Sequence, residues 1–133
     1  MKHYQGGNMK KIIIISVVSI LISSSVFASP FIQHCSNTGS SGVSFSFEGC
    51  INNNFREIDR EFGYMLHLRF CDNIGDHVSS IFINCINDNF REIDREFNYT
   101  LYLSHCYNFG DNLSYSFENC VNRNFRDIFQ EID

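Results

Sequence analysis

The sequence Phe-Arg-Glu-Ile-Asp-Arg-Glu-Phe stands at residues 55–62 and occurs again, unchanged, at residues 90–97. A looser version, Phe-Arg-Asp-Ile-Phe-Gln-Glu-Ile, stands at residues 125–132. One cysteine precedes each copy by five residues, at Cys50, Cys85 and Cys120. Self-similarity at a fixed period of 35 residues is typical of tandem structural repeats. We therefore expect three repeats, over about residues 31–65, 66–100 and 101–133.

Apolar side chains recur in each repeat at steps of three or four residues. In the first repeat they are Val43, Phe47, Ile51, Phe55, Ile58 and Phe62. Such steps place side chains on one face of an α-helix, whereas a strand needs steps of two. The spacing predicts one long helix per repeat, near residues 41–62, 76–97 and 111–132. Because one repeat is too small to bury its own apolar face, the copies should stack and share a core, as in short helical solenoids.

Both ends of each expected helix carry suitable capping residues. Ser41, Asp76 and Asp111 stand two residues before the first apolar position, where a side-chain oxygen can accept from free backbone amides. Gly63 and Asn98 follow the last apolar position, and these residue types enter the left-handed conformation that ends helices.

Two patterns favour another structure. Residues 43–47 and 113–117 alternate between apolar and polar side chains, as half-buried strands do. The Asn-rich centre is a poor helix interior, so a break is an alternative near Asn54, Asn89 and Asn124. Residues 64–71 and 99–106, between the helices, fit an extended return and a short helix equally well. The expected fold is mainly α, disulfide-stapled and built of three repeats, and the alternative is a small disulfide-rich all-β or α+β domain.

The first 28 residues have the pattern of a secretory signal peptide. A basic start at residues 9–11 precedes the apolar residues 12–22, a stretch too short to span a bilayer. Residues 26–28, Val-Phe-Ala, offer a cleavage site after Ala28. We expect a single secreted or periplasmic domain over residues 29–133, without a membrane span.

Charge narrows the classes of partner. All three lysines precede residue 29, so the remainder holds 7 Arg against 15 Asp and Glu, a formal net charge of −8. An acidic surface repels phosphate backbones and anionic lipid headgroups. The composition therefore disfavours nucleic-acid binding and polybasic docking to membranes.

Six cysteines in an exported chain of this length indicate a disulfide framework. The repeats reduce the pairings to two. One joins the cysteines between repeats, as Cys50–Cys71 and Cys85–Cys106, and leaves two unpaired. The other joins them within each repeat, as Cys35–Cys50, Cys71–Cys85 and Cys106–Cys120. We expect the second, because it uses every cysteine, and each bridge would contribute on the order of 3 kcal/mol in the chain-entropy model.

No motif for catalysis or metal binding stands out. His34 and His105 adjoin cysteines, but Phe70 occupies that place in the second repeat, and oxidised cysteines supply no thiolate. Residues 56–61 and 91–96 carry paired carboxylates, which serve as acid and base in some hydrolases. Here arginines stand three residues away, Arg60 from Glu57 and Arg56 from Asp59, so we expect solvated helical ion pairs. We therefore expect no enzyme, no cofactor and no catalytic or metal residues.

Several tyrosines lie outside the apolar stripe and are the candidates for contact with a ligand. They are Tyr64, Tyr99, Tyr102, Tyr107 and Tyr115. The sequence favours an exported, non-catalytic binding or envelope-associated module, whose partner is a protein or a glycan not yet identified. The alternatives are a carbohydrate-binding, lectin-like module and a secreted inhibitor or toxin.

Overall fold

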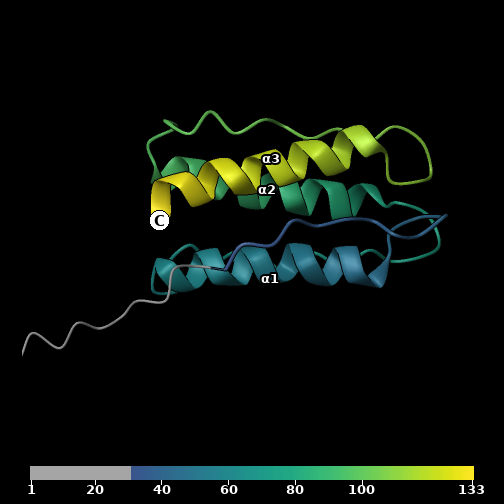
Figure 1. Ribbon diagram of the computed structural model, residues 1–133, viewed down its shortest axis with the longest axis horizontal. Helices are drawn as coiled ribbons and strands as arrows, with labels where there is room; N and C mark the ends of the chain where they lie inside the picture. The colour runs from purple at the N-terminus through teal and green to yellow at the C-terminus, as the bar shows by residue number, and fades with distance from the viewer. Residues whose placement is uncertain (1–30) are drawn as a thin grey trace, which may run out of the picture.

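The computed structural model describes residues 31–133, so the expected signal peptide of residues 1–28 lies outside the described residues. Within them the chain forms three helices and no strand (Figure 1). The helices are α1 (Phe45–Glu61), α2 (Ser80–Glu96) and α3 (Tyr115–Ile132). An extended segment precedes each helix. We name these segment 1 (residues 31–39), segment 2 (residues 67–74) and segment 3 (residues 102–109). The fold is a mainly helical, disulfide-stapled tandem repeat, as the sequence predicts.

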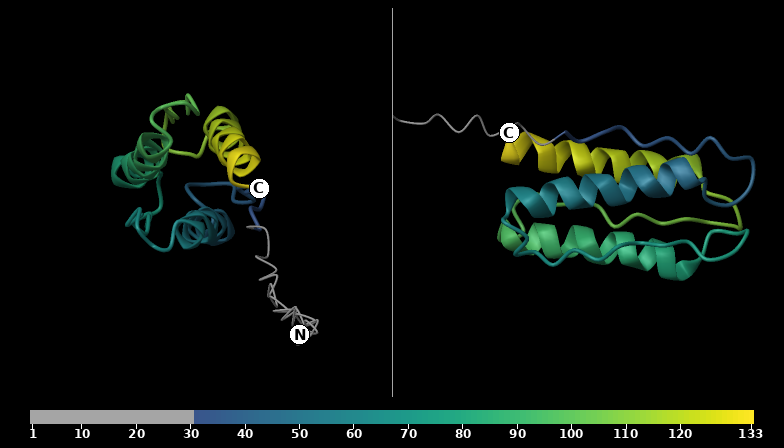
Figure 2. Two further views of the ribbon diagram at one scale, coloured as in Figure 1. Left: turned by 90° about the vertical axis from the view of Figure 1, so that its left-hand side faces the viewer. Right: turned by 90° about the horizontal axis from the view of Figure 1, so that it is seen from below.

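The three helices run in one direction, and each segment returns along them to begin the next repeat (Figure 1). Viewed end-on, the helices stand at the corners of a triangle (Figure 2). Segment 2 bonds to α1 and α2, and segment 3 bonds to α2 and α3. Segment 1 closes the ring, because the Cys35 N–H donates to Asn122 Oδ1 of α3 at 2.7 Å. The repeats thus form a closed ring with approximate threefold symmetry, not the open stack that we expected.

Each helix begins later than the sequence suggested. The residues that cap the helices are Ser44, Ser79 and Ser114, and each hydroxyl accepts the backbone N–H three residues ahead at 3.2 Å. The expected caps Ser41, Asp76 and Asp111 lie in the preceding turns. The cause is a contact within the turn: Asn37 Oδ1 accepts the Ser44 N–H at 2.7 Å, and Asn73 and Asn108 do the same for the other two caps. These bonds keep the turns out of the helix.

The helix ends agree with the sequence. Gly63 and Asn98 have left-handed backbones, with φ of 62° and 53°. The next residues, Tyr64 and Tyr99, are also left-handed, with φ of 61° and 60°. The N–H groups of Gly63 and Tyr64 donate to the carbonyls of Arg60 and Asp59, so they satisfy the last turn of α1.

The asparagines do not break the helices. In α1, Asn52 Oδ1 accepts the Cys71 N–H and Asn52 Nδ2 donates to the Cys71 carbonyl, both at 2.7 Å. Asn54 holds the N–H and carbonyl of Gln33 in the same way, at 2.9 and 2.7 Å. The equivalent pairs are Asn87 with Cys106, Asn89 with Arg69, Asn122 with Cys35, and Asn124 with Ser104. Every segment is therefore held from both sides by side-chain amides.

These amides take the place of a partner strand. An extended backbone that packs against a core needs partners for its N–H and C=O groups. An Asn inside a helix costs about 0.5 kcal/mol in propensity relative to Ala, but each of its two hydrogen bonds contributes about 1 kcal/mol. The signal in the sequence is an Asn-x-Asn pair at residues 52–54, 87–89 and 122–124.

The disulfides join each segment to the helix of its own repeat. They are Cys35–Cys50, Cys71–Cys85 and Cys106–Cys120, which is the pairing within repeats. Three intramolecular disulfides are typical of a protein that matures in an oxidising compartment.

The apolar face of each helix points to the centre of the ring. Phe55, Phe90 and Phe125 come from the three helices and contact one another edge to face, with ring centroids 5.0 to 5.2 Å apart. All three are at most 2% exposed. Edge-to-face pairs contribute roughly 0.5–1.5 kcal/mol beyond the burial of their area. The other buried residues of the apolar faces lie on both sides of these three rings. They include Phe47, Ile51 and Ile58 of α1 and the equivalent residues of α2 and α3.

Candidate functional site

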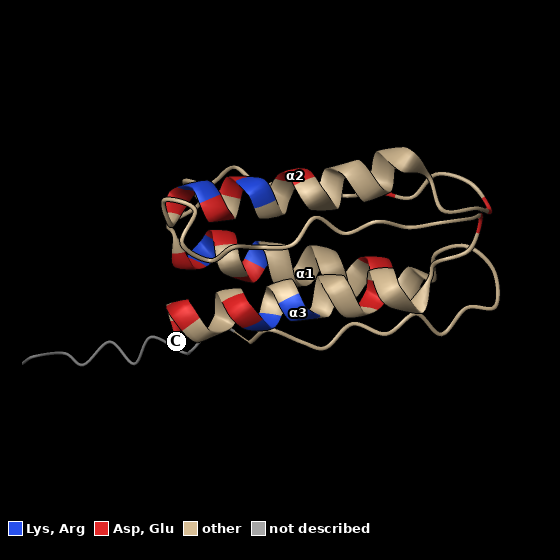
Figure 3. Ribbon diagram, turned by 90° about the horizontal axis from the view of Figure 1, so that it is seen from above, with Lys and Arg blue, Asp and Glu red and all other residues tan. Residues whose placement is uncertain are grey.

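Charged side chains gather toward one end of each helix, and several exposed apolar side chains lie at the other end. Lys and Arg are absent from the first eight residues of each helix, and charges of both signs gather from the middle onward (Figure 3). Large apolar side chains are exposed at the uncharged ends, among them Phe45 (89%), Ile81 (70%) and Tyr115 (78%). Because these apolar side chains are exposed to solvent, they contribute little to the stability of the fold.

Glu48 is an exception to this separation, and its role is structural. Its Oε2 accepts the Asn73 N–H of segment 2 at 3.1 Å. Glu118 holds Asn37 of segment 1 in the same way, whereas Ile83 occupies the equivalent position in α2. Burial raises the pKa of Glu48, and the neighbouring Asp72 raises it further, while the bond from Asn73 opposes the shift.

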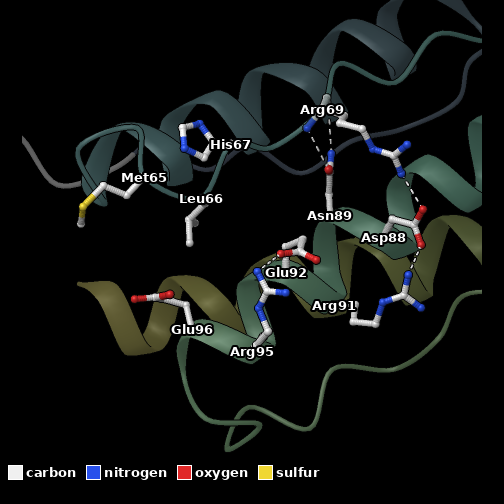
Figure 4. Close-up of a pocket in the computed structure, with 10 residues that line it drawn as sticks. All are labelled: Met65, Leu66, His67, Arg69, Asp88, Asn89, Arg91, Glu92, Arg95 and Glu96. Carbon is white, nitrogen blue, oxygen red and sulfur yellow. Dashed lines mark hydrogen bonds and ion pairs between the residues drawn. The ribbon is translucent and has the colours of Figure 1, made fainter.

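Of the paired carboxylates noted in the sequence, Glu92 and Glu96 line a groove between segment 2 and α2, with a volume of about 400 Å³, and Asp88 lines it too (Figure 4). Asp88 forms ion pairs with Arg69 and Arg91, and Glu92 forms one with Arg95. In α1 the expected pair of Glu57 with Arg60 is present at 2.6 Å.

The second expected pair, Arg56 with Asp59, does not form. Arg56 donates to Asn53 Oδ1, and Asp59 Oδ1 accepts the Leu66 N–H. Across both repeats, then, all of these carboxylates except Glu96 contact arginines or backbone amides on a solvated surface. Such pairs contribute at most about 1 kcal/mol each.

Two of the five candidate tyrosines lie in equivalent grooves, each between a segment and the preceding helix. Tyr64 lines a groove of about 220 Å³ with Arg56, Asp59 and Phe70. Tyr99 lines a groove of about 200 Å³. Its neighbours there include Arg91, Asp94, Ser104 and His105. The two rings are 58% and 56% exposed, so each offers most of its surface to a ligand.

The other three candidates all belong to the third repeat. Tyr102, Tyr107 and Tyr115 are 85%, 62% and 78% exposed. The structure brings Tyr107 together with two residues that we did not select from the sequence. Its ring centroid lies 4.5 Å from that of His105 and 6.4 Å from that of Phe109, and the Phe109 ring is tilted by 19°. Tyr102 and Tyr115 are not in this cluster.

We call His105, Tyr107 and Phe109 the aromatic row. They alternate along segment 3 with Cys106, which is buried, and Asn108, which bonds to the cap Ser114. Since alternate side chains of an extended chain point to opposite sides, the anchoring of Cys106 and Asn108 fixes the row outward. The alternation of aromatic residues with a cysteine and an asparagine was the signal in the sequence.

The histidines beside the cysteines gather no metal ligands. Residues 31–133 contain no group of three His, Cys, Asp or Glu side chains that could hold a metal ion, and their six cysteines are all in disulfides. The described helices also include none with the length and apolar character needed to cross a membrane.

Comparisons with protein-family models, with curated proteins and with solved structures give no match for this chain. A functional proposal therefore has to come from the residues and their geometry.

Proposed function

We propose that this chain is a non-catalytic binding module of an oxidising compartment, exported by a signal peptide of residues 1–28 and secreted or retained in the periplasm. The observation that carries the proposal is the exposure of aromatic side chains on a cross-linked scaffold. Within residues 31–133, twelve large hydrophobic residues are more than half exposed, and eight of them lie at the uncharged ends of the helices or in segments 2 and 3.

Exposure on this scale supports recognition by direct contact. Aromatic side chains bury large areas on binding and lose little conformational entropy, which makes them frequent energetic centres of interfaces. The disulfides and the Asn clamps hold the segments in place before any partner arrives. A fixed surface pays less ordering entropy when it binds.

The chemistry of the polar residues supports a non-catalytic role. Most carboxylates on α1 and α2, among them Glu57, Asp59 and Asp88, are bonded to arginines or to backbone amides. No cysteine of residues 31–133 has a free thiol. Covalent catalysis would need a nucleophile with an orienting base, and acid–base catalysis would need carboxylates that are not held by neighbouring arginines.

Co-sedimentation with cell envelopes tests the proposal. The oxidised chain is mixed with envelopes of the source organism, and the bound fraction is measured for the natural sequence and for a variant with Tyr102, Tyr107 and Tyr115 changed to Ser. We expect the variant to keep its fold, because all three side chains are exposed, and to lose most of its binding.

The control for this experiment is Arg60→Gln, which changes an exposed side chain at the charged end. It should bind envelopes as the natural chain does. Equal binding by all three proteins, or no binding by any, would contradict the proposal, as would turnover by the oxidised chain in a panel of hydrolase substrates.

A further inference from the structure

The three repeats share one scaffold but differ in the side chains that they turn outward. At the places of His105, Tyr107 and Phe109, the second repeat has Phe70, Asp72 and Ile74. The first repeat has His34, Ser36 and Thr38 there. A line of three rings therefore exists only in the third of the described repeats, so the scaffold does not require it.

The row also continues into a groove. His105 stands at the end of the row and lines the groove of Tyr99 between segment 3 and α2. Arg91, Asp94 and Ser104 add polar groups to that groove. Arg91 keeps most of its side chain exposed, 68%, although it pairs with Asp88. The surface from Tyr99 to Phe109 therefore offers exposed aromatic rings in a row, with hydrogen-bonding groups at one end.

From this arrangement we propose that the aromatic row and the Tyr99 groove together bind a neutral glycan. This inference rests on the proposed binding function and names its ligand. The faces of aromatic rings carry partial negative charge. They attract the polarised C–H groups on the flat side of a sugar ring, and the sugar hydroxyls then bond to side chains such as Ser104 and Asp94.

Charge decides between neutral and anionic ligands. Residues 101–122 contain no Lys or Arg, but they include Asp111 and Glu118. A phosphorylated or sulfated polymer would find no cation along the row, and Arg91 of the adjoining groove already pairs with Asp88, so the acidic chain would repel the polymer. The same argument disfavours anionic lipid.

The composition of the row favours a sugar over an apolar peptide. Its outward side chains are His, Tyr and Phe, with Ser104 and Asn119 nearby in the sequence and no aliphatic residue. The aliphatic anchors that would suit a peptide, Ile74 and Ile81, lie in the second repeat.

Calorimetric titration of the oxidised chain tests the inference. The probes are neutral hexasaccharides of glucose, mannose, xylose and N-acetylglucosamine, with dextran sulfate, phosphatidylglycerol vesicles and an apolar peptide as competitors of other chemistry. We expect saturable binding of at least one neutral hexasaccharide. Tyr107→Ser combined with Phe109→Ser should weaken it at least about tenfold, as loss of an aromatic anchor does.

The matched control is Phe70→Ser combined with Ile74→Ser, at the equivalent positions of the second repeat. Its affinity for the hexasaccharide should stay within about twofold of the natural chain, well inside the measured range of affinities. Circular dichroism and thermal unfolding verify that both variants are folded, which the exposure of all four side chains leads us to expect.

Three results would overturn the inference. They are the absence of saturation by any neutral hexasaccharide at about 1 mM, equal weakening by the control variant, and tighter binding of a sulfated polymer, vesicle or peptide. If envelope binding needs the exposed tyrosines but no glycan binds, the glycan inference fails and the binding module stands. If the chain binds neither a glycan nor the envelopes, the glycan inference and the proposed binding function both fail.

Discussion

Replacing Asn52 by Ala removes one clamp between α1 and segment 2 and leaves the rest of the ring in place. Asn52 is 8% exposed, and Cys71, whose N–H and C=O it bonds, is fully buried. Alanine supplies neither a donor nor an acceptor. The two backbone groups of Cys71 therefore lose their partners inside the protein.

The magnitude follows from these two groups. A buried backbone group without a partner costs about 1–3 kcal/mol, so the two together cost about 2–6 kcal/mol. Alanine is the better helix former by about 0.5 kcal/mol, which offsets a small part of this loss. We expect the free energy of unfolding to fall by roughly 2–5 kcal/mol, and Tm to fall by 10 °C or more at roughly 4–8 °C per kcal/mol.

Asn53→Ala is the matched control. Asn53 is the next residue of the same helix, is exposed, and bonds only to Arg56 within the described chain. In this variant the higher helix propensity of Ala is almost the only change. The free energy of unfolding should therefore stay level or rise by about 0.5 kcal/mol. Urea unfolding of the oxidised proteins, followed by circular dichroism, measures both variants. Equal stability of the two variants would refute the claim that Asn52 stabilises the protein by holding Cys71.

Two further predictions concern Glu48 and the turn at Gly42. Burial and Asp72 raise the pKa of Glu48 above its ordinary value of 4.5, so its favourable contribution is complete below about pH 4.5 and is lost as the pH rises through the folded-state pKa. Glu48→Gln stays neutral, and urea unfolding should show it gaining stability over the natural chain between pH 4 and pH 7; a gap independent of pH would contradict this. Gly42 and Gly63 both have left-handed φ, but a Cβ at Gly42 would lie 2.4 Å from the Asp76 carbonyl oxygen, while a Cβ at Gly63 meets nothing within 4 Å. Each change to Ala costs about 1–2 kcal/mol for the backbone, and thermal unfolding should show a further loss for Gly42→Ala alone; the idea fails if the two variants have the same Tm.

The helices and the disulfides could be predicted because both depend on local pattern. The stripe through Phe55 and Ile58 has helical spacing whatever surrounds it, and the cysteine intervals repeat with the units. The helix starts could not be predicted so well. Ser41 and Ser44 are equally good caps by residue type, and the choice is made by Asn37, which bonds to the Ser44 N–H from seven residues away.

Closure of the ring and the role of the asparagines depend on distant contacts. Helix propensity treats Asn54 as a weak point, because propensity takes no account of the backbone of Gln33, 21 residues earlier. The bond from Cys35 to Asn122 joins residues 87 apart and leaves no local signal.

For the candidate site, the sequence identified the exposed tyrosines but not their grouping. The sequence gives no reason to group Tyr64 with Tyr99, whereas the structure places the two in equivalent grooves. In the sequence His105 stands out only because it adjoins a cysteine, and nothing there distinguishes Phe109. Their contact with Tyr107 depends on an extended backbone that the sequence left open between strand and helix.

Amide hydrogen exchange tests the central claim most directly, namely that side-chain amides of the helices hold the extended segments. The N–H groups of Cys71 and Cys106 bond to Asn52 and Asn87 and should exchange as slowly as amides in the middle of the helices. The Phe70 N–H lies next to Cys71 in segment 2 and has no partner in the described chain, so it should exchange rapidly. Rapid exchange at all three positions would contradict the account.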